Sequence, residues 1–94
     1  YVKPSWFGIP ILISKNLERD KIVSNLEKKG VETRPIISGN FLKQPSVKKY
    51  GLIKNIKFKN ADYISNHGFF IGLPFDKIKI NILKKIERSF QKSV

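Results

Sequence analysis

The stretch Phe69-Phe70-Ile71-Gly72-Leu73 predicts a buried β-strand, because aromatic and β-branched residues follow one another in it without a charge. A short helix is expected directly before it, with Asn60 as its N-cap and Gly68 as its closing residue. A longer helix is expected after it, capped by Asp76 and reaching to about Gln91. The apolar side chains of this last helix recur at every fourth residue, with Leu83 beside them: Ile78, Ile82, Ile86 and Phe90.

A second strand is predicted near the start of the chain, at residues 6–13, which read W-F-G-I-P-I-L-I. Pro10 lacks the N–H that a strand ladder needs, so this strand is expected at a sheet edge or at a bulge. A helix should follow, with Asn16 as its N-cap and a basic last turn that ends at Gly30. Residues 31–35 then favour a short strand, because the residue before a proline is pushed out of the helical region.

The predicted order of elements is strand, helix, strand, irregular segment with a short helix, strand and helix. This order favours an α+β fold, an α/β two-layer sandwich in which a small three-stranded sheet carries its helices on one face. Residues 38–59 hold Gly39, Pro45 and Gly51 and show little periodicity, so they form the irregular segment, with a helical turn near residues 46–50. A connection of this length inside a compact domain is usually functional or mobile.

The size of the chain limits it to one small domain, residues 1–94. The chain begins at Tyr1, without a methionine, and an apolar strand follows almost at once. We therefore expect a fragment of a longer protein whose missing part holds the chemistry. No apolar run approaches the roughly 20 residues that cross a bilayer, and no secretory signal opens the chain. These features predict a soluble protein.

The charge of the chain has two interpretations. Its 19 Lys and Arg residues against 7 Asp and Glu residues give a formal net charge of +12, which is typical of nucleic-acid-binding proteins. Between Thr33 and Ala61 the chain has no acidic residue, and lysines and aromatic rings there fit a small basic module that binds nucleic acid or another polyanion. These residues are Lys43, Lys48, Lys49, Lys54, Lys57 and Lys59, with Phe41, Tyr50 and Phe58. The other interpretation is that these lysines form an ordinary solvated surface. It is supported by the scarcity of arginine, the side chain that binds phosphate oxygens in a bidentate fork.

Catalytic chemistry within the chain has little support. There is no cysteine and a single histidine, His67, so neither a metal site nor a thiol nucleophile is predicted. His67 precedes the glycine that closes a predicted helix. At that position its ring is expected either to stabilise the helix C-terminus electrostatically or to cover an edge of the core. A catalytic role for His67 is the less favoured alternative. No nucleophile elbow, Walker or Rossmann glycine pattern is present, and no catalytic residue is predicted.

Two residues are candidates for ligand binding. Arg34 stands at the end of a predicted strand, where its guanidinium can fork onto a carboxylate or a phosphate. The alternative is an exposed arginine on an edge strand. Asn40 follows Gly39 and offers both a donor and an acceptor to sugar hydroxyls. The alternative is a turn asparagine with a left-handed backbone.

Four segments of the chain carry a family resemblance. The most specific is residues 33–45, which read T-R-P-I-I-S-G-N-F-L-K-Q-P; the others are W-F-G-I-P at 6–10, N-A-D at 60–62 and G-F-F-I-G at 68–72. Together they resemble the C-terminal domain of the DegT-like family of pyridoxal-phosphate-dependent nucleotide-sugar enzymes. The R-P-x-x-x-G-N-F form with Q-P after it is more similar to the branch of 3-dehydratases that make deoxysugars for lipopolysaccharide than to the aminotransferase branch.

The resemblance implies the small C-terminal domain of a fold-type-I enzyme, whose large domain, absent here, holds pyridoxal phosphate or pyridoxamine phosphate. The implied parent reaction is 3-dehydration of a 4-keto-6-deoxy nucleotide sugar, or amino transfer to it, in the cytoplasm. A homodimeric parent is implied, with neither a membrane nor a nucleic acid as partner, and the isolated chain should be inactive. The resemblance assigns substrate contacts and closure of the active site to Arg34, Gly39, Asn40 and Phe41.

Overall fold

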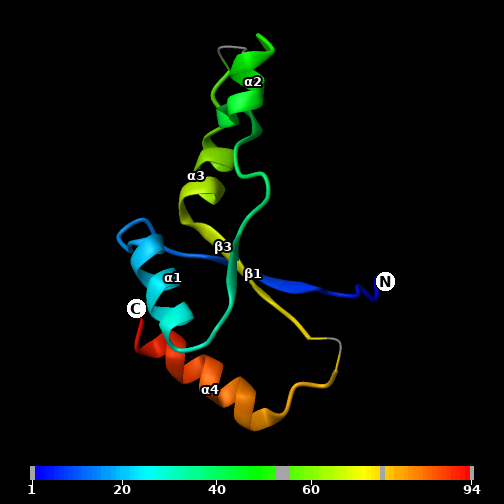
Figure 1. The fold of residues 1–94 in the computed structure, drawn as a ribbon, viewed down its shortest axis with the longest axis vertical. Coiled ribbons are helices and arrows are strands. Elements are labelled where there is room, and N and C mark those ends of the chain that lie inside the picture. Colours follow the sequence, from blue (N-terminus) through cyan, green and yellow to red (C-terminus); the bar gives the residue numbers. More distant parts are fainter. Residues whose placement is uncertain (1, 53–55, 75, 94) are drawn as a thin grey trace.

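The computed structural model describes residues 2–52, 56–74 and 76–93. Lys54 of the predicted lysine group lies outside the described residues. The elements in chain order are β1 (Gly8–Leu12), α1 (Arg19–Lys28), β2 (Thr33–Pro35), the 3-10 turn η1 (Phe41–Lys43), α2 (Pro45–Lys49), α3 (Lys59–His67), β3 (Gly68–Gly72) and α4 (Ile80–Gln91). The sheet lies at the centre, and α2 and α3 form an arm that projects from it (Figure 1). The molecule measures 49 × 34 × 24 Å.

The sheet has three strands in the order β1-β3-β2, and β3 is antiparallel to both neighbours. In this register Ile11 of β1 and Pro35 of β2 both lie opposite Phe69. Directly paired residues point to the same face of a sheet, so these side chains share one face and the next residue, Phe70, points to the other. The predicted sheet is confirmed, and Pro10 lies on an edge strand as expected.

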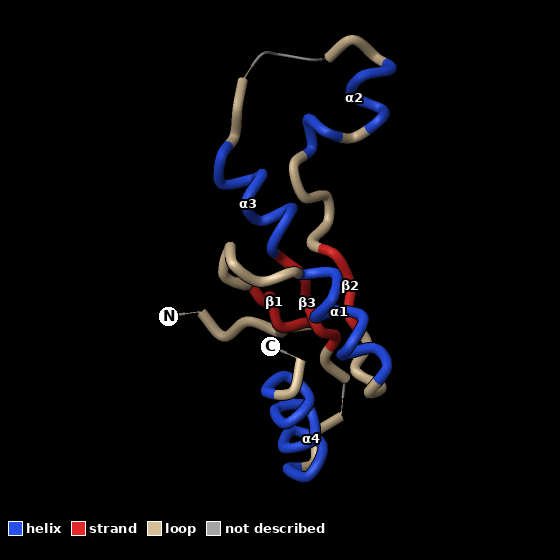
Figure 2. The backbone as a smooth tube through the Cα atoms, turned by 90° about the vertical axis from the view of Figure 1, so that its left-hand side faces the viewer, coloured by secondary structure: helices blue, strands red, loops and turns tan. Residues whose placement is uncertain are grey.

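The hydrophobic core lies between one face of the sheet and two helices. Ile22 and Leu26 of α1 pack with Phe69 and Ile71 of β3, and the exposed fractions of Leu26 and Phe69 are 0% and 1%. The Phe90 ring of α4 stacks on the Phe69 ring at a centroid distance of 6.3 Å. Figure 2 shows α1 and α4 beside the strands. The prediction of helices on one face of a small sheet is therefore confirmed.

The predicted helix starts are wrong at all three N-caps, Asn16, Asn60 and Asp76. The structure has Glu18, Phe58 and Lys79 at these positions, none of them with a side-chain capping bond. A side-chain cap contributes only about 1 kcal/mol, which is less than the burial of one large apolar side chain. Packing of the apolar helix faces therefore decides where these helices begin.

The predicted ends fit better than the predicted starts. Gly30 follows α1 with a φ of +80°, a left-handed conformation that favours glycine. Gly68 is the C-cap of α3, and β3 begins at the same residue. The last helix ends at Gln91 as predicted.

The arm is bonded to the sheet at its base. The Tyr63 hydroxyl of α3 donates to the Ile13 carbonyl at 2.9 Å, and the Ile13 amide donates to the His67 carbonyl at 3.1 Å. Arg19 Nη1 donates to the Ser65 carbonyl at 2.6 Å. Within the arm, α2 matches the helical turn that was predicted near residues 46–50. None of the helices in the described ranges is long and apolar enough to cross a membrane.

Candidate functional site

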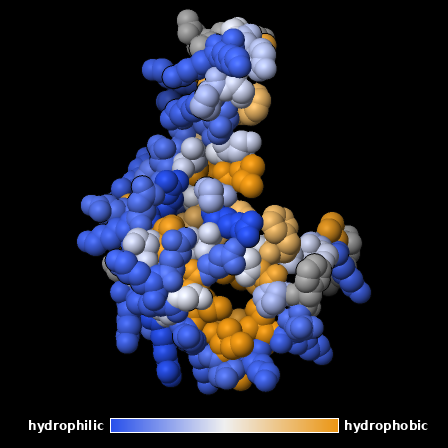
Figure 3. All heavy atoms as spheres, viewed as in Figure 1, coloured by the Kyte–Doolittle hydropathy of each residue, from blue (hydrophilic) through white to orange (hydrophobic). Residues whose placement is uncertain are grey.

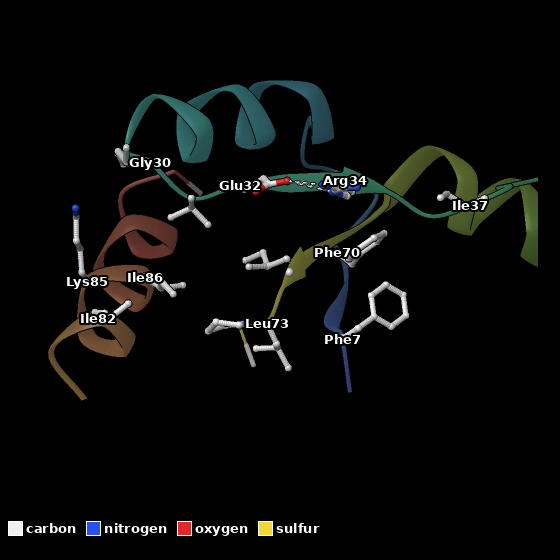
Figure 4. Close-up of a pocket in the computed structure, with 15 residues that line it drawn as sticks. Phe7, Gly30, Glu32, Arg34, Ile37, Phe70, Leu73, Ile82, Lys85 and Ile86 are labelled. Carbon is white, nitrogen blue, oxygen red and sulfur yellow. Dashed lines mark hydrogen bonds and ion pairs between the residues drawn. The ribbon is translucent and has the colours of Figure 1, made fainter. Parts of the chain in front are cut away.

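A cleft of about 790 Å³ opens between the sheet and α4. Figure 3 shows a hollow there, bordered by hydrophobic side chains. In Figure 4, Ile86 of α4 lies on one side of the cleft and Phe70 of the sheet on the other. Three cations, Lys29, Arg34 and Lys85, line it together with a single acid, Glu32. Apolar walls with an excess of cations suit a ligand that has both apolar and anionic parts.

Arg34 lies at the mouth of this cleft. It pairs with Phe70 in the sheet register, so its side chain is on the face opposite the core. Its Nη2 and Nε donate to Glu32 Oε1 at 2.8 and 3.1 Å, and 63% of the side chain is exposed. Arg34 is therefore an exposed arginine on an edge strand, and it also lines the cleft. A guanidinium has five N–H donors, so this ion pair leaves three of them for a ligand.

Aromatic rings cover the outer face of the sheet beside Arg34. A Cβ on Gly8 would lie 2.7 Å from Phe70 Cδ2, so the Phe70 ring packs directly on the glycine. Phe7 meets Phe70 edge-on at a centroid distance of 5.6 Å, and Trp6 is 63% exposed. The sequence pattern does not predict this cluster, because residues 6–13 read as one continuous strand, whereas β1 begins only at Gly8. The signal was present in two bulky aromatic residues directly before a glycine.

The backbone of the turn at Asn40 differs from the left-handed turn that was one interpretation of this residue. Asn40 has an extended backbone, with φ −89° and ψ 106°, and Gly39 holds the left-handed conformation, with φ +65°. The left-handed asparagine is therefore wrong. Asn40 Nδ2 donates to Asp62 Oδ1 at 2.8 Å, and Asn40 Oδ1 accepts from the Leu42 amide at 3.1 Å. Its amide is thus engaged within the chain, and the residue is only 6% exposed.

The four predicted site residues do not form one cluster. Arg34 lines the cleft, whereas Gly39, Asn40 and Phe41 lie outside its lining. The Phe41 ring remains 59% exposed at the start of η1. The structure therefore has an anion-binding candidate at the cleft and a separate turn at the base of the arm.

We expect Gly39→Ala to destabilise the protein more than Gly51→Ala. Both glycines have a φ of +65°, so alanine is strained at both by about 1–2 kcal/mol. At Gly39 the new Cβ also lies 2.7 Å from Ser65 Oγ. A Cβ added at Gly51 has no described atom within 4 Å. Thermal denaturation of both variants measures the difference. The double change Gly39→Ala with Ser65→Gly should recover the part due to the clash, and equal melting temperatures for the two single variants would contradict the contact.

Asp62 gives the fold a dependence on acid. The hydrogen bond from Lys43, followed by that from Asn40, lowers the pKa of Asp62 from its ordinary value of 3.8. A carboxyl with a lowered folded-state pKa stabilises the fold above its unfolded pKa and loses this stabilisation as the pH falls through the folded value. We expect Asp62→Asn to be less stable than the wild type at neutral pH and the two stabilities to converge below pH 3.8. Melting temperatures across the acid range test this, and a constant difference would contradict it.

The described residues do not fit the role of a covalent cofactor anchor. A lysine that forms a Schiff base needs a shielded site that lowers its pKa. Every described lysine is exposed except the half-buried Lys29. The Lys29 ammonium donates to the Ser89 carbonyl at 3.2 Å and to Ser93 Oγ at 2.9 Å, so it joins α1 to the end of α4. His67 ends α3, with its ring stacked on Tyr63 at 4.5 Å, which supports its structural interpretation.

No family model matches the chain, but several curated relatives do. It is 41% identical over 71 residues to a GDP-4-keto-6-deoxy-D-mannose 3-dehydratase from Escherichia coli O55:H7, covering 72% of this chain and 18% of that protein. It is 37% identical over 92 residues to the enzyme of that name from Yersinia pseudotuberculosis, covering 86% of this chain and 23% of that protein. It is 34% identical over 78 residues to the lipopolysaccharide biosynthesis protein RfbH of Salmonella typhimurium, covering 74% of this chain and 16% of that protein.

The backbone agrees with a solved structure of the same kind. A crystal structure of GDP-4-keto-6-deoxymannose-3-dehydratase with a trapped PLP-glutamate geminal diamine matches at a TM-score of 0.72 and 35% identity, over 87% of this chain and 22% of that one. The chain thus spans about a fifth of the length of the relatives it matches. The polyanion-binding alternative is not favoured by these matches. Sequence and backbone agree over most of the chain, which is homologous to a segment of the GDP-4-keto-6-deoxy-D-mannose 3-dehydratases.

Proposed function

We propose that this chain is the small C-terminal domain of a pyridoxal-phosphate-dependent nucleotide-sugar 3-dehydratase, where it contributes substrate contacts and active-site closure. The observation that carries the proposal is the agreement of sequence and backbone with a solved 3-dehydratase. The proposed parent reaction removes the 3-hydroxyl of a GDP-linked 4-keto-6-deoxy sugar for lipopolysaccharide biosynthesis. The names of the relatives favour this reaction over amino transfer. A homodimeric parent in the cytoplasm belongs to the same proposal.

In this proposal the cofactor is bound mainly by the large domain of the parent enzyme, which is not part of this chain. When bound, pyridoxal phosphate or pyridoxamine phosphate supplies the electron sink for the chemistry at the sugar. None of the exposed lysines here is suited to anchor it, and Lys29 is already bonded to the end of α4. The residues of this chain bind and orient the substrate.

Arg34 is the residue that we assign to the anionic part of the substrate. A GDP-linked sugar carries a diphosphate, and a guanidinium binds phosphate oxygens in a planar fork. Arg34 is exposed at the mouth of the cleft and is held in place by Glu32. The rings of Phe7 and Phe70 beside it form an apolar wall for the rest of the ligand.

A chimeric enzyme tests the proposal. Residues 1–94 replace the homologous segment of the Escherichia coli relative, and the purified chimera is given GDP-4-keto-6-deoxy-D-mannose together with glutamate, the amino donor seen with the cofactor in the solved 3-dehydratase, which supplies the two electrons needed to replace the 3-hydroxyl by hydrogen. We expect it to bind pyridoxal phosphate and to form a sugar that lacks the 3-hydroxyl, as measured by mass spectrometry. The 94-residue chain alone should form none. A chimera that binds the cofactor but forms no 3-deoxy sugar would contradict the proposal that this chain supplies substrate contacts and closure in such an enzyme.

A further inference from the structure

A second cavity adjoins the Arg34 cleft on the outer face of the sheet. It has a volume of about 250 Å³ and lies between the residues around the start of β1 and the two residues that follow β2. Phe7 and Phe70 line both this cavity and the cleft, so the two hollows share a wall. Because Trp6 also lines it, three of its side chains are aromatic, and we name it the aromatic pocket.

The register of the sheet places the aromatic pocket beside the Arg34 guanidinium. Pro10 of β1 and Arg34 of β2 both pair with Phe70 of β3, so the three side chains form one row on the outer face. Neighbouring strands are about 4.8 Å apart. Figure 4 shows Phe70 between Arg34 and Phe7. A ligand that binds Arg34 through an anionic group can therefore place a neighbouring group in the pocket.

The Phe7 ring is held in position although it precedes β1. The Leu73 amide donates to the Phe7 carbonyl at 2.8 Å, which fixes the backbone of Phe7 against the end of β3. Its ring meets the Phe70 ring at an interplanar angle of 78°, and the Phe70 ring packs on Gly8. Phe7 nevertheless remains 77% exposed. It is thus an ordered ring with a free surface, and such a ring loses little conformational entropy when a ligand packs on it.

The chemistry of the pocket decides which part of a nucleotide sugar fits it. Among the described residues that line it, the Trp6 indole N–H is the only hydrogen-bonding group of a side chain. The hydroxyls of a sugar ring would lose water there without finding partners, which is unfavourable. A nucleobase instead presents two flat π faces that stack on aromatic rings, while its polar edge stays in water. The lining therefore favours the base over the sugar.

We propose that the aromatic pocket is the subsite for the base of the nucleotide sugar, with the Phe7 ring as its stacking surface. This inference rests on the proposed function, since it divides that substrate between two neighbouring hollows. The diphosphate lies at Arg34 and the base in the pocket. The larger cleft has charged side chains in its lining, so it is left for the sugar and its hydroxyls.

Calorimetric titration of the full-length holoenzyme tests the subsite with two probes, GDP and inorganic pyrophosphate. Phe7→Ala should raise the Kd for GDP by roughly 5- to 150-fold, the loss expected for one base–aromatic stack. It should leave the Kd for pyrophosphate unchanged, because pyrophosphate has no base. Phe7→Tyr keeps a stacking ring and should bind GDP as the wild type does. Arg34→Ala should weaken the binding of both probes.

Tyr50→Ala is the matched control, because Tyr50 is 70% exposed and lines neither the cleft nor the aromatic pocket. It should leave both dissociation constants unchanged. A Kd for GDP that Phe7→Ala does not change overturns the subsite. An equal loss of GDP and pyrophosphate binding also overturns it, because Phe7 would then support the fold rather than the base. Phe7→Leu keeps an apolar side chain without a flat ring and replaces the alanine variant if that one does not fold.

The titrations need no turnover, so the two proposals fail separately. A protein that binds GDP through Phe7 but forms no 3-deoxy sugar would refute the proposed function and leave the subsite standing. A protein that forms the 3-deoxy sugar but binds GDP equally well in the wild type and in Phe7→Ala would refute the subsite alone.

Discussion

Replacing Arg34 by alanine in the full-length protein lowers kcat/KM for the nucleotide sugar by roughly 10- to 100-fold, the size expected for a lost charge-assisted hydrogen bond to a substrate anion. The melting temperature should hardly change. Arg34 is 63% exposed and pairs with Glu32, which is 75% exposed, and such surface pairs contribute about 0–1 kcal/mol to stability. Steady-state kinetics and thermal denaturation on the same preparations measure both quantities.

Two further variants separate charge from geometry at this position. Arg34→Lys keeps the charge but not the planar fork, so we expect it to recover only part of the lost kcat/KM. Arg88→Ala removes an exposed arginine of α4 that does not line the main cleft, and it should behave as the wild type. A large fall in melting temperature for Arg34→Ala would make Arg34 a structural residue.

The second large effect is on stability. Phe69→Ala should cost about 3–5 kcal/mol, because it leaves a cavity where a fully buried ring stood. Phe69 is 1% exposed and is the side chain on which α1 and α4 both pack. A native domain is stable by only about 5–15 kcal/mol, so this variant should lose a large part of its stability.

Urea denaturation followed by circular dichroism measures this loss. The matched control is Leu12→Ala, because Leu12 lies in an edge strand of the same sheet but is 54% exposed. It should shift the midpoint only slightly. Similar midpoints for the two variants would contradict the assignment of Phe69 to the centre of the core.

Local patterns predicted the elements better than their boundaries. The run at Phe69 predicts a strand and the apolar spacing after it predicts a helix, because both depend on neighbours in sequence. The N-caps Asn16, Asn60 and Asp76 failed, since a capping bond is weak compared with the burial of a helix face. Gly30 succeeded because a left-handed residue after a helix is a local requirement that glycine meets at little cost.

The sequence by itself determined the order of elements, the apolar faces that form the core, and the motif that carries the family resemblance. The tertiary structure decided where the candidate site residues lie and which groups they contact. Asn40 reaches Asp62, 22 residues further along the chain, and this contact makes it part of a structural network. Arg34 lies at the mouth of a cleft only because β2 pairs with β3 and α4 packs nearby. Such contacts depend on how distant segments pack, and neither composition nor periodicity contains that information.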